Sequence, residues 1–461
     1  MGVALVTGQE PSDGALQIEE REALRRVAGL STELTDITEV EYRQVRLERV
    51  VLIAVWTSGT AVGAERSLAE LARLAQTAGA VVLEALIQRR NKPDPGTYVG
   101  SGKARELTEI VRALEADTLI CDGELTPGQL SQLERIVKVK VVDRTWLILD
   151  IFAQHARSRE GKTQVELAQL EYMLPRLRGW GEAMSRQAAT GGGIGALRGP
   201  GETKLEVDRR RIRTQMARLR RQLRSMGQSR AVQRAERHRT GTPSVAIVGY
   251  TNAGKSSLLN QLTDAGVLVR DELFATLDPT VRRARTPSGR EYTLADTVGF
   301  VRHLPHQLVE AFRSTLEEVH QADLLVHVVD GSDSDPLGQI AAVREVLAEI
   351  DAGGIPELIT VNKSEITPSE ILAEIRARHP DALAVSARTG SGIDDVKVAI
   401  EAHLPRPDVA VRVTIPFDRG DLVSEVHEHG DVLASTYSDH GTDLRALVPG
   451  WLAARLAEFA D

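Results

Sequence analysis

The stretch Gly249–Ser256, GYTNAGKS, constrains the fold of this chain more than any other segment. It lies between the apolar run VAIV and the helix-like segment SSLLNQL. In that strand–loop–helix context its glycines let backbone amides curl around a phosphate, Lys255 neutralises the charge, and the Ser256 hydroxyl reaches Mg²⁺. The segment therefore predicts a phosphate-binding loop at the end of a parallel strand.

Three further short motifs follow the phosphate loop, and each ends a predicted strand. Asp296–Gly299, DTVG, offers a carboxylate to hold the metal through water and a glycine amide to face the terminal phosphate. Asn362–Glu365, NKSE, is similar to the guanine-reading NKxD motif, and Ser386–Arg388 supplies the matching SA element. One such motif is a weak signal, but four in this order predict a guanine-nucleotide-binding domain.

Two positions depart from the usual GTPase pattern. Glu365 stands where aspartate is usual, so we expect guanine to be preferred over adenine by a narrower margin. Phe300 stands where many GTPases have a glutamine that orients the attacking water, and a phenyl ring cannot do that. We therefore predict slow intrinsic hydrolysis that rises when a partner completes the site.

The remaining sequence divides into segments of contrasting pattern. Residues 1–46 are acidic and weakly periodic, which predicts a partly mobile extension with one helix near Leu16–Val27. Residues 47–156 and 240–404 alternate apolar runs with helix-like segments, as is typical of parallel sheets flanked by helices. Residues 405–461 predict a small α/β module. The fold class is α/β, with a P-loop GTPase domain following an N-terminal α/β domain and a helical linker.

That linker, residues 157–239, is basic in an otherwise acidic chain. It holds twenty Lys or Arg and eight Asp or Glu, whereas the whole chain has a formal net charge of -8. Its apolar residues recur every three or four positions, which predicts the two helices of an antiparallel hairpin. Pro175 should kink or end the first helix. The glycine-rich stretch Gly191–Gly201 is expected at the tip.

Composition excludes several function classes. The chain has no window of about 18 apolar residues, so we expect no membrane span. Its first residues lack the pattern of a signal peptide. Cys121 is the single cysteine and lies in an apolar run, so we expect a buried structural thiol in a reducing cytoplasm. His303 and His306 have a spacing that suits a metal, but without other ligands nearby we interpret them as a polar helix face.

Longer segments resemble the HflX GTPases of the Obg–HflX group. They are GYTNAGKSS, FATLDPT at Phe274–Thr280, DTVGF, RRNKPDPGTYVGSGKARELTE at Arg89–Glu109 and GGGIGALRGPGETKLEVDRRRI at Gly191–Ile212. The resemblance covers roughly residues 48–404 and leaves the acidic extension unexplained. Within it, Gly100–Lys103 mimics a phosphate loop but lacks the first glycine at the right spacing. We interpret that stretch as a family loop rather than a second nucleotide site.

The resemblance implies a GTP hydrolase that binds the large ribosomal subunit and splits or recycles stalled and stress-arrested ribosomes. One alternative is a GTP-regulated assembly or sensor protein that binds the large subunit without splitting ribosomes. Another is an RNA-remodelling enzyme that uses ATP through the N-terminal domain, which the incomplete second phosphate loop disfavours. The expected ligands are GTP or GDP and Mg²⁺, with K⁺ as a further candidate. The protein is expected to be a cytoplasmic monomer.

The residues expected to carry the nucleotide chemistry overlap. Lys255, Asn252, Thr276 and Gly299 are the catalytic candidates, and the resemblance implies that Asn252 helps to hold K⁺ near the phosphates. Ser256, Thr276 and, through water, Asp296 are the candidate Mg²⁺ ligands, with Thr280 the less favoured switch threonine. The nucleotide-binding set is Gly249, Tyr250, Thr251, Asn252, Ala253, Gly254, Lys255, Ser256, Ser257, Phe274, Ala275, Thr276, Leu277, Asp278, Asp296, Thr297, Val298, Gly299, Asn362, Lys363, Glu365, Ser386, Ala387 and Arg388.

The basic hairpin is the candidate RNA-binding element. Arginines supply phosphate contacts, and a glycine tip lets the backbone approach folded RNA closely. The plainer alternative is a solvated, charged helical hairpin, since most charge runs are only that. The expected RNA-binding residues are Gly191, Gly192, Gly193, Arg198, Lys204, Arg209, Arg210, Arg211, Arg218, Arg220 and Arg221.

Overall fold

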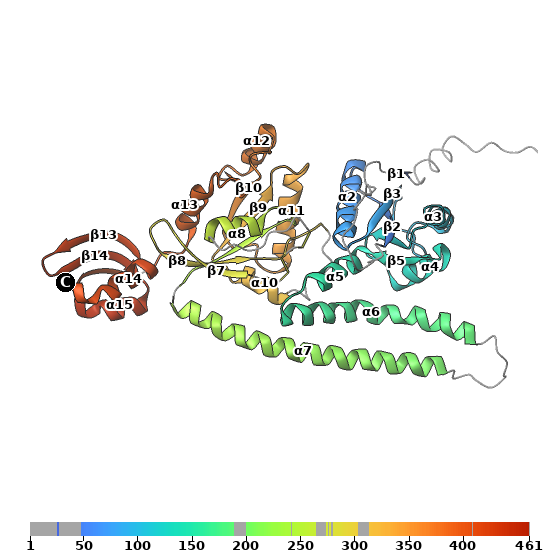
Figure 1. The fold of residues 1–461 in the computed structure, drawn as a ribbon, viewed down its shortest axis with the longest axis horizontal. Helices are drawn as coiled ribbons and strands as arrows, with labels where there is room; N and C mark the ends of the chain where they lie inside the picture. Colours follow the sequence, from blue (N-terminus) through green and yellow to red (C-terminus); the bar gives the residue numbers. More distant parts are fainter. Residues whose placement is uncertain are drawn as a thin grey trace, which may run out of the picture. The chain divides into compact units, whose positions relative to one another are not determined.

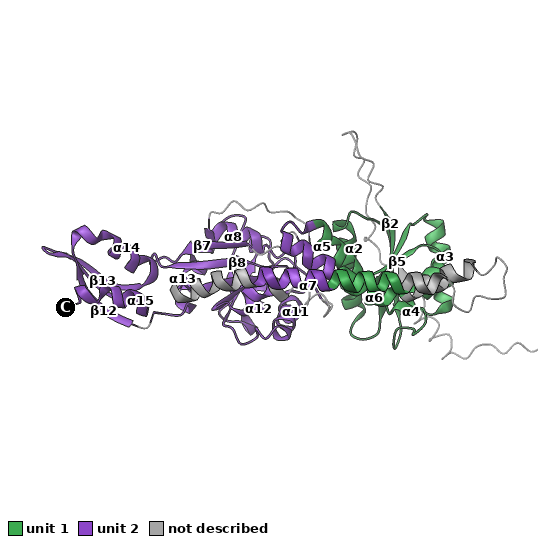
Figure 2. Ribbon diagram, turned by 90° about the horizontal axis from the view of Figure 1, so that it is seen from below, with its two compact units in different colours: residues 1–154, 168–216 green, residues 155–167, 217–461 purple. Residues whose placement is uncertain are grey.

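The computed structural model of the protein describes residues 25–26, 48–188, 200–240, 242–263, 273–274, 276–277, 280–302, 313–407 and 409–460. The chain divides into two compact units, one of residues 1–154 and 168–216 and the other of residues 155–167 and 217–461 (Figure 2). Two of its boundaries, after residues 167 and 216, fall inside long helices. None of the helices in the described ranges is both long enough and apolar enough to cross a membrane.

The first unit contains a five-stranded sheet in the order β1-β3-β2-β4-β5. Figure 1 labels β1, β3, β2 and β5 of this sheet. Four strands are parallel: β2 (Arg49–Trp56), β3 (Val81–Arg89), β4 (Thr118–Asp122) and β5 (Lys140–Asp143). The connecting helices are α2 (Ala61–Thr77), α3 (Ser101–Ala113), α4 (Pro127–Val137) and α5 (Arg144–His155). The strand–helix alternation predicted for this region is confirmed.

The helix expected near Leu16–Val27 is wrong in the part that the structure describes. Arg25–Arg26 form a short strand, β1, paired antiparallel with β3. Pairing with the edge of β3 satisfies backbone groups that a weakly amphipathic helix would have to satisfy alone. The other residues of that predicted helix lie outside the described ranges.

Two long helices follow, α6 (Arg159–Ala188) and α7 (Pro200–Thr240). Pro175 is predicted to kink or end the first helix. It does not end it, because α6 continues through it, and the kink stays a prediction. A proline cannot donate its backbone N–H within a helix. In the same turn, Arg176 Nη1 donates to the Tyr172 carbonyl at 2.9 Å, so a side chain supplies a hydrogen bond beside the interruption. Of the glycine-rich stretch expected at the tip, Gly191–Gly201, residues 191–199 lie outside the described ranges, and Pro200 and Gly201 begin α7.

The second unit contains a six-stranded sheet in the order β11-β10-β9-β6-β8-β7. The parallel strands are β6 (Ser244–Gly249), β8 (Glu291–Asp296), β9 (Leu324–Asp330), β10 (Glu357–Asn362) and β11 (Leu383–Ala384), and β7 (Thr280–Arg285) pairs antiparallel at one edge. Its helices are α8 (Lys255–Thr263), α10 (Arg313–His320), α11 (Pro336–Glu349), α12 (Ser369–Arg378) and α13 (Ile393–His403). This is the predicted P-loop GTPase fold, and the carboxyl ends of its parallel strands lie at one edge.

A small antiparallel sheet ends the chain, with β12 (Val409–Ile415), β14 (Gly441–Val448) and β13 (Asp431–Ser438) in that spatial order. The helices α14 (Gly420–His429) and α15 (Gly450–Leu456) contribute Leu422, Val426 and Leu452 to the core. That core also holds Ile415 and Leu444 from the sheet. Because one side of β12 and of β14 is apolar, the helices can bury it, and the predicted mixed α/β module results.

Candidate nucleotide site

The phosphate loop, residues 249–256, joins β6 to α8. Gly249 has a φ of 151° and Gly254 has a φ of 92°. A Cβ atom on Gly249 would lie 2.2 Å from the Val328 carbonyl oxygen, and one on Gly254 would lie 2.2 Å from Asn362 Nδ2. Both positions therefore need glycine, for the backbone angle and for the close approach of the neighbouring strands.

Three oxygen-bearing side chains converge where α8 begins. Ser256 Oγ lies 2.8 Å from Thr276 Oγ1 and donates to Asp296 Oδ2 at 2.5 Å. Thr276 Oγ1 donates to the same carboxylate oxygen at 3.2 Å. The structure thus brings Thr276 to the predicted metal position. Thr280 instead begins β7, where its backbone pairs with that of Asp296.

The cluster of Ser256, Thr276 and Asp296 has the chemistry of a Mg²⁺ site. Asp296 is fully buried, and its Oδ1 atom has no hydrogen-bond partner among the described residues. Burial raises the pKa of Asp296, while Lys255 and the two hydroxyl hydrogen bonds oppose this shift. A buried carboxylate with a spare oxygen beside two hydroxyls is the hard donor set that Mg²⁺ prefers, so the residues fit that ion.

Lys255 lies buried beneath the phosphate loop. Its Nζ donates to the Tyr250 carbonyl at 2.8 Å. Burial lowers the pKa of Lys255 to about 8, and the charge of Asp296 opposes the shift. A Cβ atom on Gly299 would lie 3.0 Å from this Nζ, so the DTVG segment passes directly beside the lysine. The arrangement places one positive charge between the loop and the glycine that follows β8.

The guanine-reading motifs meet around Asn362 at the end of β10. Its Nδ2 donates to the Ala253 carbonyl at 2.9 Å, and its Oδ1 accepts from the Ala387 backbone N–H at 2.9 Å. One amide therefore connects the phosphate loop with the SA element. Lys363 Nζ pairs with Asp330 at 2.7 Å, which holds the following turn against β9.

Glu365 lies beside the SA element. Arg388 Nε donates to its Oε1 at 3.0 Å. The Ser386 hydroxyl first, and Arg388 in addition, lower the pKa of Glu365. The longer glutamate arm is thus held by two neighbours at the place where the sequence predicts base recognition, and its carboxylate is ionised at neutral pH.

Phe300 and Asn252 take different positions around the loop. The Phe300 ring is 1% exposed and belongs to the core, so it presents no polar group to a water molecule. Asn252 is exposed and has a φ of 59°, a left-handed conformation that asparagine tolerates better than most residues. Slow hydrolysis and a K⁺ role for Asn252 remain predictions.

The other expected nucleotide contacts are distributed around the same edge. Phe274 and Leu277 are buried, Ser257 is half-buried in α8, and Thr297 donates to the Ile247 carbonyl at 2.7 Å. Val298 is also buried. The expected contacts Ala275 and Asp278 lie outside the described ranges, as do the histidines His303 and His306.

The expected RNA-binding arginines lie on α7. Arg209 is half-buried, and exposed side chains belong to Arg210, Arg211, Arg218, Arg220 and Arg221. Lys204 belongs to the helix, but its side chain is not described, and the expected residues Gly191, Gly192, Gly193 and Arg198 lie outside the described ranges.

Two further arginines that are not in the predicted RNA-binding set, Arg213 and Arg224, are also exposed on α7. They stand four residues after Arg209 and Arg220, and the helical period could have found them because residues four apart share a face.

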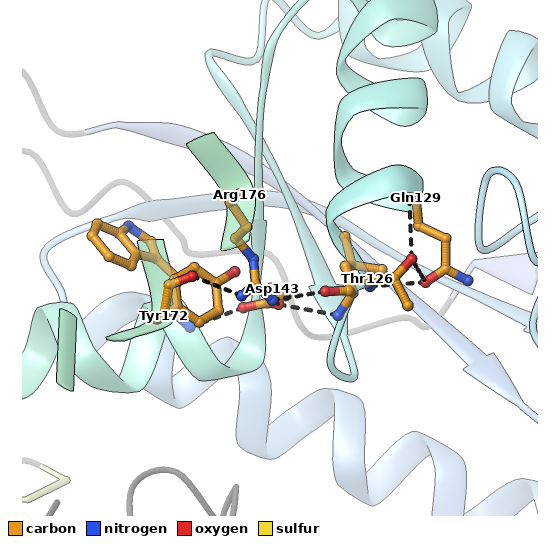
Figure 3. A network of polar contacts seen from close by, with 7 residues as sticks. Thr126, Gln129, Asp143, Tyr172 and Arg176 are labelled. Carbon is orange, nitrogen blue, oxygen red and sulfur yellow. Dashed lines mark hydrogen bonds and ion pairs between the residues drawn. The ribbon is translucent and has the colours of Figure 1, made fainter. Parts of the chain in front are cut away.

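The carboxyl edge of the first unit's sheet is filled by the chain's own side chains. Asp143, at the end of β5, accepts hydrogen bonds from the backbone N–H groups of Leu125 at 3.0 Å and Trp146 at 2.9 Å. Arg176 Nη2 contacts the same carboxylate at 3.4 Å (Figure 3). Next to it, the buried Arg144 pairs with Asp122 at 2.9 Å and with Glu70.

Cys121 lies in β4 of the same sheet. It is fully buried, as expected for a structural thiol, and burial raises its pKa well above the ordinary value, with Asp143 and Asp122 adding to the shift. A thiol that resists ionisation is a poor nucleophile, so its environment suits packing rather than reaction.

Three family models match consecutive parts of the chain. Residues 65–153 match the model described as GTP-binding GTPase N-terminal, and residues 155–237 match GTP-binding GTPase Middle Region. Residues 244–363 match the model described as 50S ribosome-binding GTPase.

Curated relatives match most of the chain. A protein named GTPase HflX from Lacrimispora saccharolytica is 44% identical over 93% of this chain and 99% of its own length. The GTPase HflX of Escherichia coli is 44% identical over 78% of this chain and 84% of its own length. Among solved structures, a GTP-binding protein from Sulfolobus solfataricus in complex with GDP is 26% identical, covering 77% of this chain and 98% of that one with a TM-score of 0.39.

Proposed function

The chain belongs to the HflX family of GTPases and is a GTP hydrolase, and from this premise we propose that it binds the large ribosomal subunit and separates stalled or stress-arrested ribosomes. The match of residues 244–363 to a family of 50S ribosome-binding GTPases supports the ribosome as partner. We further propose that the protein works in the cytoplasm as a monomer.

The observation that carries the catalytic part of the proposal is the convergence of Ser256, Thr276 and Asp296 beside Lys255. When bound there, Mg²⁺ would neutralise charge on the phosphates. Lys255 would supply a second positive charge, and the Gly299 N–H would donate to the terminal phosphate. The loop amides, whose path is set by Gly249 and Gly254, would bind the remaining phosphate oxygens.

Base recognition would depend on Asn362, Glu365 and the Ser386–Arg388 segment. Asn362 is already anchored to the phosphate loop through Ala253, so a bound base would lie in fixed register with the phosphates. The ionised Glu365 carboxylate would accept from the guanine N–H groups, which adenine does not present in that arrangement.

Hydrolysis by the isolated protein should be slow, because the buried Phe300 cannot hold the attacking water. Two additions would raise the rate. The large subunit would order the segments around Thr276 and Gly299, and K⁺ near Asn252 would offset negative charge that develops on the phosphates. Comparing hydrolysis rates in KCl and NaCl tests the second idea, and equal rates would remove Asn252 from this role.

Ribosome binding would use the exposed arginines of α7. Each phosphate contact should contribute a slope of roughly -0.7 to -0.9 to the logarithm of affinity against the logarithm of salt concentration. Replacing Arg210, Arg220 and Arg221 with glutamine should flatten that slope and leave GTP binding intact. Unchanged slopes would mean that α7 is only a solvated helix.

The deciding experiment incubates intact ribosomes with the protein and GDP, GTP or a non-hydrolysable GTP analogue, followed by sedimentation. A larger share of free subunits in the samples with GTP than in those with GDP supports splitting. Retention on intact or large subunits without separation would favour the alternative, a GTP-regulated assembly or sensor protein. Slow intrinsic hydrolysis suits that alternative as well, so only the subunit ratio separates the two functions.

A further inference from the structure

The phosphate loop and the segment after β8 are joined by a short ladder of hydrogen bonds. The Thr251 N–H donates to the Phe300 carbonyl at 2.8 Å, and the Phe300 N–H donates to the Gly249 carbonyl at 3.1 Å. Tyr250 adds a side-chain contact, because its hydroxyl accepts the Arg302 backbone N–H at 2.6 Å.

Arg302 is held from a second direction by its own side chain. Its Nη2 pairs with Asp335 Oδ2 at 2.6 Å. Asp335 caps the amino end of α11, where its Oδ1 accepts the Gly338 N–H at 3.1 Å. The backbone of residue 302 is therefore tied to the loop, and its guanidinium is tied to a helix on the same domain.

Gly299 lies just before the residues that these contacts hold. A Cβ atom there would be 2.9 Å from Thr251 Cα and 3.0 Å from Lys255 Nζ, so the backbone at residue 299 already touches the loop and the lysine. Three residues later the chain is pinned at Arg302. The position of the Gly299 N–H thus depends on contacts that Tyr250 and Arg302 make outside the phosphate site itself.

We propose that Tyr250, through its hydroxyl, and Arg302 are positioning residues for GTP hydrolysis, which hold the Gly299 backbone where it meets the terminal phosphate. The inference rests on the nucleotide site proposed above. GDP lacks the terminal phosphate, so the hydroxyl should matter for GTP and hardly at all for GDP. That difference separates a positioning role from a general effect on folding.

The sharpest test is Tyr250→Phe, which keeps the buried ring and removes one oxygen. Withdrawing an acceptor from the partly buried Arg302 N–H disfavours the arrangement in which residue 302 is tied to the loop. Affinity for a non-hydrolysable GTP analogue should therefore fall about tenfold, the equivalent of about 1.4 kcal/mol. GDP affinity should stay within about twofold, and kcat should fall with the GTP affinity. Both affinities are measured by fluorescence titration on the full chain.

Arg302→Gln and Asp335→Asn test the second tie. Asparagine retains the capping oxygen of α11, so the variant removes the charge and spares the helix. The pair is partly exposed, so each variant should lower GTP affinity only about twofold to threefold, and the double variant should lose no more than one of them. Arg344→Gln is the matched control. Arg344, on α11, pairs with Glu357, on β10, and this ion pair does not involve the segment after β8. It should leave the GTP-to-GDP affinity ratio unchanged.

An unchanged GTP-to-GDP ratio and an unchanged kcat in Tyr250→Phe would overturn the inference. Equal losses for GTP and GDP would overturn it too, since they would indicate a structural role. Lys255→Ala distinguishes these outcomes from failure of the site itself. If Lys255→Ala weakens nucleotide binding by about a hundredfold while Tyr250→Phe changes nothing, only the positioning role is contradicted. If both leave GTP binding intact, the nucleotide site falls with it.

Discussion

The two mainly parallel sheets of this chain have carboxyl edges of opposite character. At the edge of β4 and β5, Asp122 and Asp143 face the buried guanidinium groups of Arg144 and Arg176, and backbone N–H groups complete the set. At the edge of β6 and β8, Asp296 keeps one carboxylate oxygen with no hydrogen-bond partner among the described residues. At the first edge the carboxylates are paired with the chain's own cations, and at the second a carboxylate oxygen is left available to a ligand.

The comparison teaches what the topology alone does not decide. Both sheets bring loops together at the place where ligands usually bind to parallel α/β folds. Burial raises the pKa of both Asp143 and Asp296, so burial does not distinguish them either. The partners do. At the edge of β4 and β5, arginine side chains neutralise the carboxylates and make the edge part of the core. At the edge of β6 and β8, hydroxyls, a lysine and a glycine-containing loop surround Asp296 but leave one of its oxygens available to a ligand.

The largest effect should come from removing a buried arginine from the edge of β4 and β5. Arg144→Met leaves Asp122 and Glu70, which are mostly buried, without their cation, and this should lower the free energy of unfolding by about 3–5 kcal/mol. GTP affinity should be retained in the folded fraction. Chemical denaturation followed by near-ultraviolet signals of the first unit measures the loss. A change below about 1 kcal/mol would show that this edge is more solvated than its packing indicates.

The second-largest effect should come from removing Lys255, which lies beside the edge of β6 and β8. Lys255→Ala deletes the buried charge beside the phosphate loop and should weaken GTP and GDP binding by about a hundredfold, with little effect on the unfolding of the first unit. Isothermal titration on wild type and variant gives the comparison. Wild-type affinity in this variant would contradict the role of the loop.

A smaller effect concerns pH. Burial lowers the pKa of Lys255 to about 8 in the free protein. The protonated form binds phosphate, so affinity should be constant below pH 8 and decline above it. Between pH 7 and pH 9 the loss should be about tenfold. Lys255→Arg, which stays charged, should bind with a flat profile over that range whatever its absolute affinity. A flat wild-type profile would contradict the lowered pKa.

The smallest effect should come from the base-reading loop. Glu365→Asp restores the usual aspartate, and its shorter arm would move away from Arg388. We expect the preference for GTP over ATP to rise by about threefold, measured by competition, because a direct contact with guanine replaces a more adaptable one. Arg376→Gln, on exposed α12, is a control for changes of charge on the same domain and should leave the preference unaltered.

Much of the candidate site could be predicted because its signals are local. The glycine spacing of residues 249–254 and the lysine and serine after it specify a backbone path and a charge within one loop. The apolar runs before each motif predict the strands, and parallel strands then place their ends together. The positions of Asp296 and Asn362 follow from that rule alone, and Thr276 follows from the resemblance of its segment.

Other features depended on contacts between residues far apart in the chain. Nothing in the sequence indicates that the Tyr250 hydroxyl meets the Arg302 N–H, or that Arg302 meets Asp335, because each residue alone is an ordinary aromatic or surface charge. The same holds for Arg144, whose two carboxylate partners come from separate elements, and for the short strand at Arg25–Arg26.

The sequence by itself determined the class of the protein, the strand–helix order and the loop that is predicted to bind phosphate, since these follow from spacing, periodicity and local backbone preference. Only the tertiary structure decided which sheet edge is filled, that α6 continues through Pro175, and which side chains brace Gly299. The physical reason is that a side chain's partner is set by the order and register of strands. That order reflects the packing of the whole domain and not the preference of any single segment.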